Sequence, residues 1–185
     1  GKYVYECSPA GAWKTVSGTF DWKSCALTFK TGETTGWSTL YLVLRKSTGT
    51  VRFADIRLEE AAKPVAVVSA KQENLVRNPG FDGMKAWSLT QWTKIYGRIS
   101  TADRNMILAN DDLKQTTMAQ QGVKLKPHTE YRISFRIKGE NITTDGAKNS
   151  GACIMILHQG KYVYECSPAG AWKTVSGTFD WKSCA

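Results

Sequence analysis

Residues 1–26 and residues 160–185 are the same 26 letters in the same order, GKYVYECSPAGAWKTVSGTFDWKSCA. The offset is 160 − 1 = 159 residues, so 159 is the natural period and the remaining 26 residues are overlap. A period of that length corresponds to a whole domain, because solenoid repeats are only ~20–50 residues long. Two causes fit the identity: a tandem array of near-identical domains, or a segment that was duplicated by design.

Hydrophobic residues recur with period two, which predicts strands rather than helices. In residues 131–138 apolar side chains alternate with polar ones, and in residues 40–45 leucines alternate with other residues. In residues 51–58 the apolar alternation changes phase between Phe53 and Ile56. That switch predicts a bulge or burial on both faces. Turn residues recur about every ten positions, as in Asn78-Pro79-Gly80. The pattern predicts an all-β fold, an antiparallel β-sandwich of the jelly-roll type.

The segment 61–73, AAKPVAVVSAKQE, lacks aromatic residues and predicts a linker. Residues 1–60 are then the C-terminal part of one sandwich repeat, and residues 74–185 are the N-terminal part of the next. Three arrangements follow from this shifted register. The two parts close on each other as a circular permutant with one copy left over, or 74–185 pairs with 27–60 of another chain and grows head to tail. In the third arrangement, the chain is a segment of a longer protein.

Joined in the order 74–185 and then 27–60, the sequence resembles the family 4/9 carbohydrate-binding modules. Four segments support the resemblance: NLVRNPGFDGMKAW (74–87), LKPHTEYRISFRIKG (125–139), WKTVSGTFDW (172–181) and LYLVLRKSTGTVRFADIRL (40–58). In the second segment His128 stands where the family usually has glycine. The resemblance implies a jelly-roll β-sandwich of the kind appended to glycanases and surface proteins.

One 159-residue unit has three cysteines, Cys153, Cys166 and Cys184, of which the last two correspond to Cys7 and Cys25. In a hairpin with a two-residue loop at Gln159-Gly160, two residues lie opposite each other when their numbers add up to 319. Cys153 and Cys166 meet this condition, which predicts a disulfide between them. The competing pair is Cys166–Cys184. Either bridge indicates an oxidising setting, and we therefore expect an extracellular or cell-surface protein.

The net charge of +9 comes from 25 basic and 16 acidic residues. It indicates either an anionic partner or a lysine-rich surface that only keeps the protein soluble. The basic residues form no run, so we expect no nucleic-acid binding. No apolar stretch approaches the ~18–20 residues of a membrane helix, so we expect no membrane span. The two histidines have neither zinc-ligand spacing nor a nucleophile beside them, and no phosphate-binding or dinucleotide motif occurs. We expect no enzymatic activity.

The resemblance implies a structural Ca²⁺ between the first and last strands. The matching carboxylates are Asp82, in Gly80-Phe81-Asp82, and Asp55, in Phe53-Ala54-Asp55. Carboxylate and carbonyl oxygens from two loops suit this hard cation. The alternative is that both acids serve as turn residues without a metal.

Sugar binding would need exposed aromatic rings, and four are predicted as ligand-binding residues: Trp92, Tyr96, Tyr162 and Tyr164. Trp92 and Tyr96 lie in the polar segment 90–100, where a role in core packing is a less natural reason for an aromatic residue. Residues 153–164 are apolar at both odd and even positions, so one face covers the core and the other lines a cleft or an inter-domain contact.

These observations favour a non-catalytic extracellular repeat domain that forms a head-to-tail structural or adhesive filament with copies of itself. Identical repeats suit regular spacing better than diversified recognition. The alternative functions are a glycan-binding module of a secreted modular enzyme, with a polysaccharide partner, and an engineered duplicated segment.

Overall fold

The computed structural model describes the backbone of residues 2–8, 11–12, 17–31, 36–61, 72–89, 97–145, 150–159, 162–163, 165–166 and 172–173. It describes the side chains of residues 17–31, 37–61, 72–88, 97–145 and 150–156. Every regular element in these ranges is a strand. The same ranges contain no helix with the length and apolar character needed to cross a membrane.

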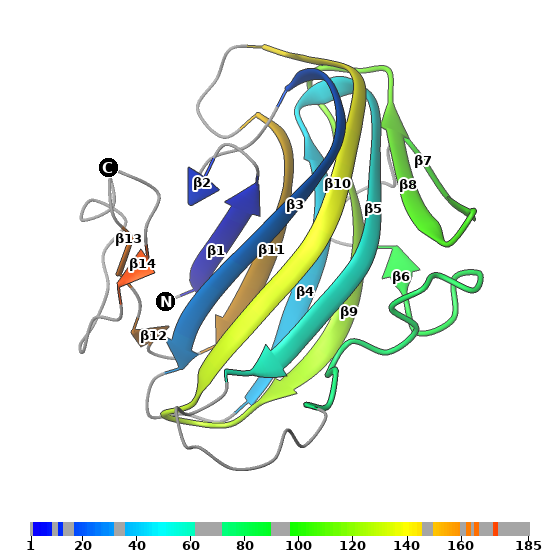
Figure 1. The fold of residues 1–185 in the computed structure, drawn as a ribbon. Coiled ribbons are helices and arrows are strands. Elements are labelled where there is room, and N and C mark those ends of the chain that lie inside the picture. The colour runs from blue at the N-terminus through cyan, green and yellow to red at the C-terminus, as the bar shows by residue number, and fades with distance from the viewer. Residues whose placement is uncertain are drawn as a thin grey trace.

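The strands form two six-stranded sheets and one small pair, all antiparallel. Sheet A contains, in spatial order, β2 (Gly11–Ala12), β1 (Lys2–Ser8), β11 (Gly151–Gln159), β4 (Gly36–Arg45), β9 (Thr116–Leu125) and β6 (Ser88–Leu89). Sheet B contains β12 (Tyr162–Val163), β3 (Gly18–Thr31), β10 (Glu130–Thr144), β5 (Ser47–Glu60), β8 (Asn105–Asn110) and β7 (Arg98–Ala102). The third sheet pairs β13 (Glu165–Cys166) with β14 (Trp172–Lys173). Figure 1 shows β3, β10 and β5 as one curved layer in front of β11, β4 and β9.

The core lies between the two sheets and is built from the alternating residues of each strand. Leu40, Leu42 and Leu44 of β4 share one buried cluster with Ile133 and Phe135 of β10. Burying each such side chain stabilises the fold by about 1.5–3 kcal/mol. The predicted all-β antiparallel sandwich is confirmed, whereas the jelly-roll topology stays a prediction.

The phase switch in β5 is a bulge, as the sequence predicts. Ser134 of β10 lies opposite Arg57, and two residues later Arg136 lies opposite Ala54, so β5 has one extra residue in this interval. Asp55 sits in the bulge with a φ of 52°. The bulge allows both Phe53 and Ile56 to be fully buried although they are three residues apart.

His128 adopts a φ of 48°, in the left-handed region that glycine enters most easily. The turn is held by Thr31, whose hydroxyl donates to the Lys126 carbonyl at 2.6 Å and accepts from the Thr129 amide at 3.0 Å. The Tyr131 hydroxyl accepts the Lys126 amide at 2.8 Å.

In the middle of both sheets, strands that precede residues 61–73 in the sequence alternate with strands that follow them. In sheet B, β10 lies between β3 and β5, and its Tyr131 is opposite Phe29 on one side and Glu60 on the other. In sheet A, β4 lies between β11 and β9. Residues 2–60 and 98–159 therefore form one sandwich within this chain. Of the predicted linker, residues 62–71 lie outside the described residues.

The two identical copies occupy different places. Tyr3 of the first copy lies opposite His158 of β11, whereas its equivalent, Tyr162, lies opposite Thr31 of β3. Glu165 and Cys166 pair with β14 and not with β11. The hairpin predicted to join 154–159 to 160–166 is therefore not formed by the second copy. Only one strand fits beside β11 on this side, and β1 fills that position.

The structure does not support the predicted Cys153–Cys166 disulfide. Cys153 lies opposite Val43 of β4, Cys166 lies opposite Trp172, and Cys7 lies opposite Ile154 rather than Cys153. The register differs by one residue because the strand beside β11 comes from the first copy, which no tight turn at residues 159–160 constrains. Cys25 is a buried free thiol in sheet B, and no disulfide joins it to Cys153, the other cysteine with a described side chain. Cys184 lies outside the described residues.

Burial raises the pKa of the Cys25 thiol from 9.0 to about 11, although Lys23 opposes this shift. The unfolded thiol ionises near 9.0, so its contribution to stability is complete below that pH and is lost as the pH rises toward 11. At pH 8 the thiolate fraction falls from about one tenth to about one thousandth. We expect iodoacetamide to modify Cys25 about a hundredfold more slowly in folded than in urea-unfolded protein, measured on the tryptic peptide 24–30. Equal rates would contradict the burial of this thiol.

Candidate functional site

The chain docks onto β5 through one amide immediately after residues 62–71. The Asn74 Oδ1 atom accepts hydrogen bonds from the Leu58 amide at 3.0 Å and the Val76 amide at 3.1 Å. Its Nδ2 group donates to the Ile56 carbonyl at 3.0 Å. The side chain thus satisfies backbone groups of β5 as a neighbouring strand would. The Asn-Leu-Val motif positions the loop that follows.

A buried glutamine holds that loop, residues 77–87, against sheet A. Gln121 of β9 is only 2% exposed. Its Oε1 atom accepts the Arg77 amide at 2.7 Å, and its Nε2 group donates to the carbonyls of Arg77 at 2.8 Å and Ala86 at 3.2 Å. Both ends of the loop are therefore tied to one side chain, which no sequence motif indicated.

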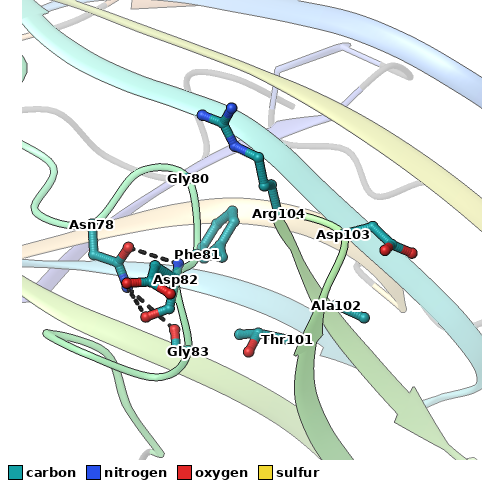
Figure 2. A pocket seen from close by; sticks show the side chains of 9 residues that line it. All are labelled: Asn78, Gly80, Phe81, Asp82, Gly83, Thr101, Ala102, Asp103 and Arg104. Atoms are coloured by element: carbon teal, nitrogen blue, oxygen red, sulfur yellow. Dashed lines mark hydrogen bonds between the residues drawn. The ribbon is translucent and has the colours of Figure 1, made fainter.

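Asn78 organises the interior of the same loop. Its Nδ2 group donates to the carbonyls of Asp82 and Gly83 at 3.4 and 3.2 Å, and its Oδ1 atom accepts the Asp82 amide at 2.9 Å (Figure 2). The same Nδ2 group donates to the Lys85 carbonyl at 2.9 Å. The Trp87 indole donates to the Asn78 carbonyl at 3.3 Å. Together with the bonds from Gln121, these bonds fix the shape of the loop.

A depression of about 510 Å³ opens between this loop and the turn that joins β7 to β8. Asp103 and Arg104 form the turn, both with left-handed φ values of 50° and 61°, as a two-residue type I′ hairpin requires. The Arg104 guanidinium lies over Gly80, where a Cβ atom would be 3.2 Å from Nη2. Figure 2 shows Arg104 and Asp103 pointing away from each other at the rim.

The depression combines two carboxylates, Asp82 and Asp103, with one guanidinium, so its charge is mixed. Asp82 is exposed, and its carboxylate lies 3.4 Å from the Lys85 ammonium. Within the described residues, no three His, Cys, Asp or Glu side chains gather where they could hold a metal ion.

The two predicted calcium ligands each have a basic partner in the structure. Asp55, in the β5 bulge, forms an ion pair of 2.5 Å with Arg136, which also lies 5.0 Å from the centre of the Trp22 ring. Asp55 does not line the depression that contains Asp82. The carbonyls of the 78–85 loop accept hydrogen bonds from Asn78. Calcium binding by Asp55 and Asp82 stays a prediction.

The four predicted ligand-binding aromatic residues cannot be placed as side chains. Trp92, Tyr96 and Tyr164 lie outside the described residues. Tyr162 is described only as backbone, in β12 opposite Thr31. Their role in binding stays a prediction.

The outer face of sheet A, which points away from the core, has a second apolar cluster. Tyr41 and Val43 of β4 and Cys153 and Met155 of β11 form it, with Met118 of β9 packed against them. Residues 151–156 are all buried, which confirms that both faces of this strand are covered. By contrast, the outer face of sheet B has ion pairs such as Arg57–Glu59 and Arg52–Glu140.

Trp37 lies at the end of β4 on the same outer face and is 69% exposed. Its ring covers Gly122 of β9, where a Cβ atom would be 3.4 Å from the ring carbon Cε3. Lys124 lies directly opposite Trp37, and Thr39 and Gln120 follow on the same face. The result is a flat aromatic surface beside an ammonium, a hydroxyl and an amide group. Trp37 is not among the predicted ligand-binding residues, although the alternation of β4 places it in phase with Tyr41 and Val43.

We expect Gln121→Leu to lower the free energy of unfolding by about 2–3 kcal/mol, because it leaves buried backbone groups of the loop without partners. Amide hydrogen exchange within residues 77–87 should accelerate. Gln120→Leu, on the outer face of the same strand, is the matched control and should change stability by less than about 1 kcal/mol. Equal losses for the two variants in urea unfolding would contradict the role of Gln121.

No protein-family model, curated protein or solved structure matches this chain.

Proposed function

We propose that the chain is a non-catalytic structural repeat of an extracellular or cell-surface protein, a jelly-roll domain of the carbohydrate-binding-module type that assembles head to tail. The supporting observation is the interleaving of strands in both sheets. Neither 2–60 nor 98–159 has a complete sheet, because β10 needs β3 and β5, and β4 needs β9 and β11. Each part is therefore an obligatory partner of the other.

A part that needs a partner can obtain it from its own chain or from another one. The contacts are the same in both cases, so the choice depends on chain concentration and on linker geometry rather than on new chemistry. An exact 159-residue period would repeat this exchange at regular intervals. Such a series gives a linear array, and the paired strands leave few open sheet edges.

The full 185-residue chain should therefore assemble in a concentration-dependent way. We expect monomers at low micromolar concentration and elongated particles with a regular axial spacing at high concentration, after refolding from denaturant. Light scattering after size-exclusion chromatography and negative-stain electron microscopy measure this. Monomers at every concentration would rule out the assembly proposal.

A second candidate function is polysaccharide binding on the outer face of sheet A. The exposed Trp37 ring favours it, since aromatic surfaces flanked by a few polar groups are typical of ligand sites. Lys124 beside the ring and the net charge of +9 favour an acidic polysaccharide over a neutral one.

For this candidate, Trp37→Ala should weaken retardation in affinity gels by at least about tenfold in apparent dissociation constant. Trp22→Ala, which removes an aromatic ring from the outer face of sheet B, is the matched control and should leave retardation unchanged. Alginate, pectate and chondroitin sulfate are suitable acidic probes, with cellulose derivatives as neutral ones. The candidate fails if none of them retards the parent chain or if both variants behave alike.

A further inference from the structure

The first copy of the duplicated segment builds one flank of the sandwich. In sheet A it supplies β1, next to β11, and in sheet B it supplies β3 up to Ala26, next to β10. We call residues 2–26 the flank segment. Figure 1 shows β1 and β3 on the same side of the molecule, opposite the β7–β8 hairpin.

The flank segment fits its position through particular side chains as well as through backbone pairing. Phe20 packs against Gly139 of β10, where a Cβ atom would be 2.3 Å from its ring. Cys25 is buried in the core opposite Phe135. Residues 160–185 have the same letters at every equivalent position, so they offer the same side chains to the same two strands.

The observed register prevents the second copy from filling this flank in its own chain. Lys2 lies opposite Gln159, and the equivalent of Lys2 in the second copy is Lys161. Only Gly160 separates Gln159 from Lys161, whereas antiparallel strands need at least about two residues to turn. A slip of one residue turns every side chain to the other face of the sheet. A slip of two residues shifts the strand by about 7 Å along β11.

From this register we infer that the second copy, residues 160–185, occupies the flank of another molecule of the same chain. There it displaces residues 1–26 from β11 and β10 of the acceptor. The inference rests on the proposed head-to-tail function and specifies its contact: the donor is the second copy, and the acceptor is the edge formed by β11 and β10. Exchange between molecules lets the second copy fill a flank without changing the register.

Because the two copies are identical, the same substitutions can be placed in either one. Val4→Pro with Tyr5→Pro breaks the first copy, and Val163→Pro with Tyr164→Pro breaks the second. Adjacent prolines remove the hydrogen bond to β11 whichever residue donates it, since proline has no amide hydrogen. Each variant is the matched control of the other, with the same composition and the same change in strand propensity.

The measurement is the concentration at which refolded chains begin to assemble, from light scattering after size-exclusion chromatography. Breaking the first copy should lower that concentration by at least about tenfold, because the flank then accepts only a donor from another chain. Breaking the second copy should abolish assembly and leave a folded monomer. Near-ultraviolet circular dichroism monitors folding in each sample.

Three results would overturn the inference. The first is assembly of the second-copy variant at the same concentration as the parent, which would leave the assembly proposal standing but remove the exchanged strand. The second is a folded, strictly monomeric first-copy variant. The third is a first-copy variant that stays unfolded at high concentration, since the second copy then fails to replace the first. If the parent and both variants remain monomeric throughout, the proposed head-to-tail function fails as well.

Discussion

The pairing of β10 with two strands from the other side of the linker is the interaction on which the rest of the structure depends. Through it, β3 and β5 place Leu27, Phe29, Ile56 and Leu58 against the strands of sheet A. Without both neighbours, the backbone groups of β10 would lack partners along its length, and its five core residues would lose their contacts with the adjacent strands. The fold is therefore a joint property of two segments that neither has alone.

Much of this fold follows from the sequence, because a strict period of two leaves little freedom about which side chains are buried. The alternations at 40–45 and 131–138 and the bulge near Asp55 were all predictable in this way. The register beside β11 was not, because the prediction assumed a tight turn at Gln159-Gly160. Once the neighbouring strand comes from the first copy, that turn no longer sets which residues face each other, and the predicted cysteine pair is lost.

The candidate sites were less predictable than the fold for a related reason. Asp55 was predicted as a calcium ligand, and no sequence pattern indicated that its carboxylate would form an ion pair with Arg136 on the adjacent strand. Gln121 and Asn78 bind backbone groups that are distant in sequence or lie within an irregular loop, and local patterns do not encode such contacts. Trp37 could have been predicted as an exposed aromatic residue, because the alternation along β4 places it outside the core. The position of its ring over Gly122 could not, because that contact depends on the register between β4 and β9.

The flank also sets the order in which the molecule can be built. Lys2 and Gln159 are 159 − 2 = 157 residues apart, so their pairing closes a loop of nearly the whole chain. Contacts of such long sequence separation form late in folding, after more local pairs such as β7 with β8. During that interval the β11 edge is open to any strand of suitable sequence. Under the proposed exchange, the concentration of newly made chains would set the outcome kinetically, and rapid dilution would yield closed molecules from the same polypeptide.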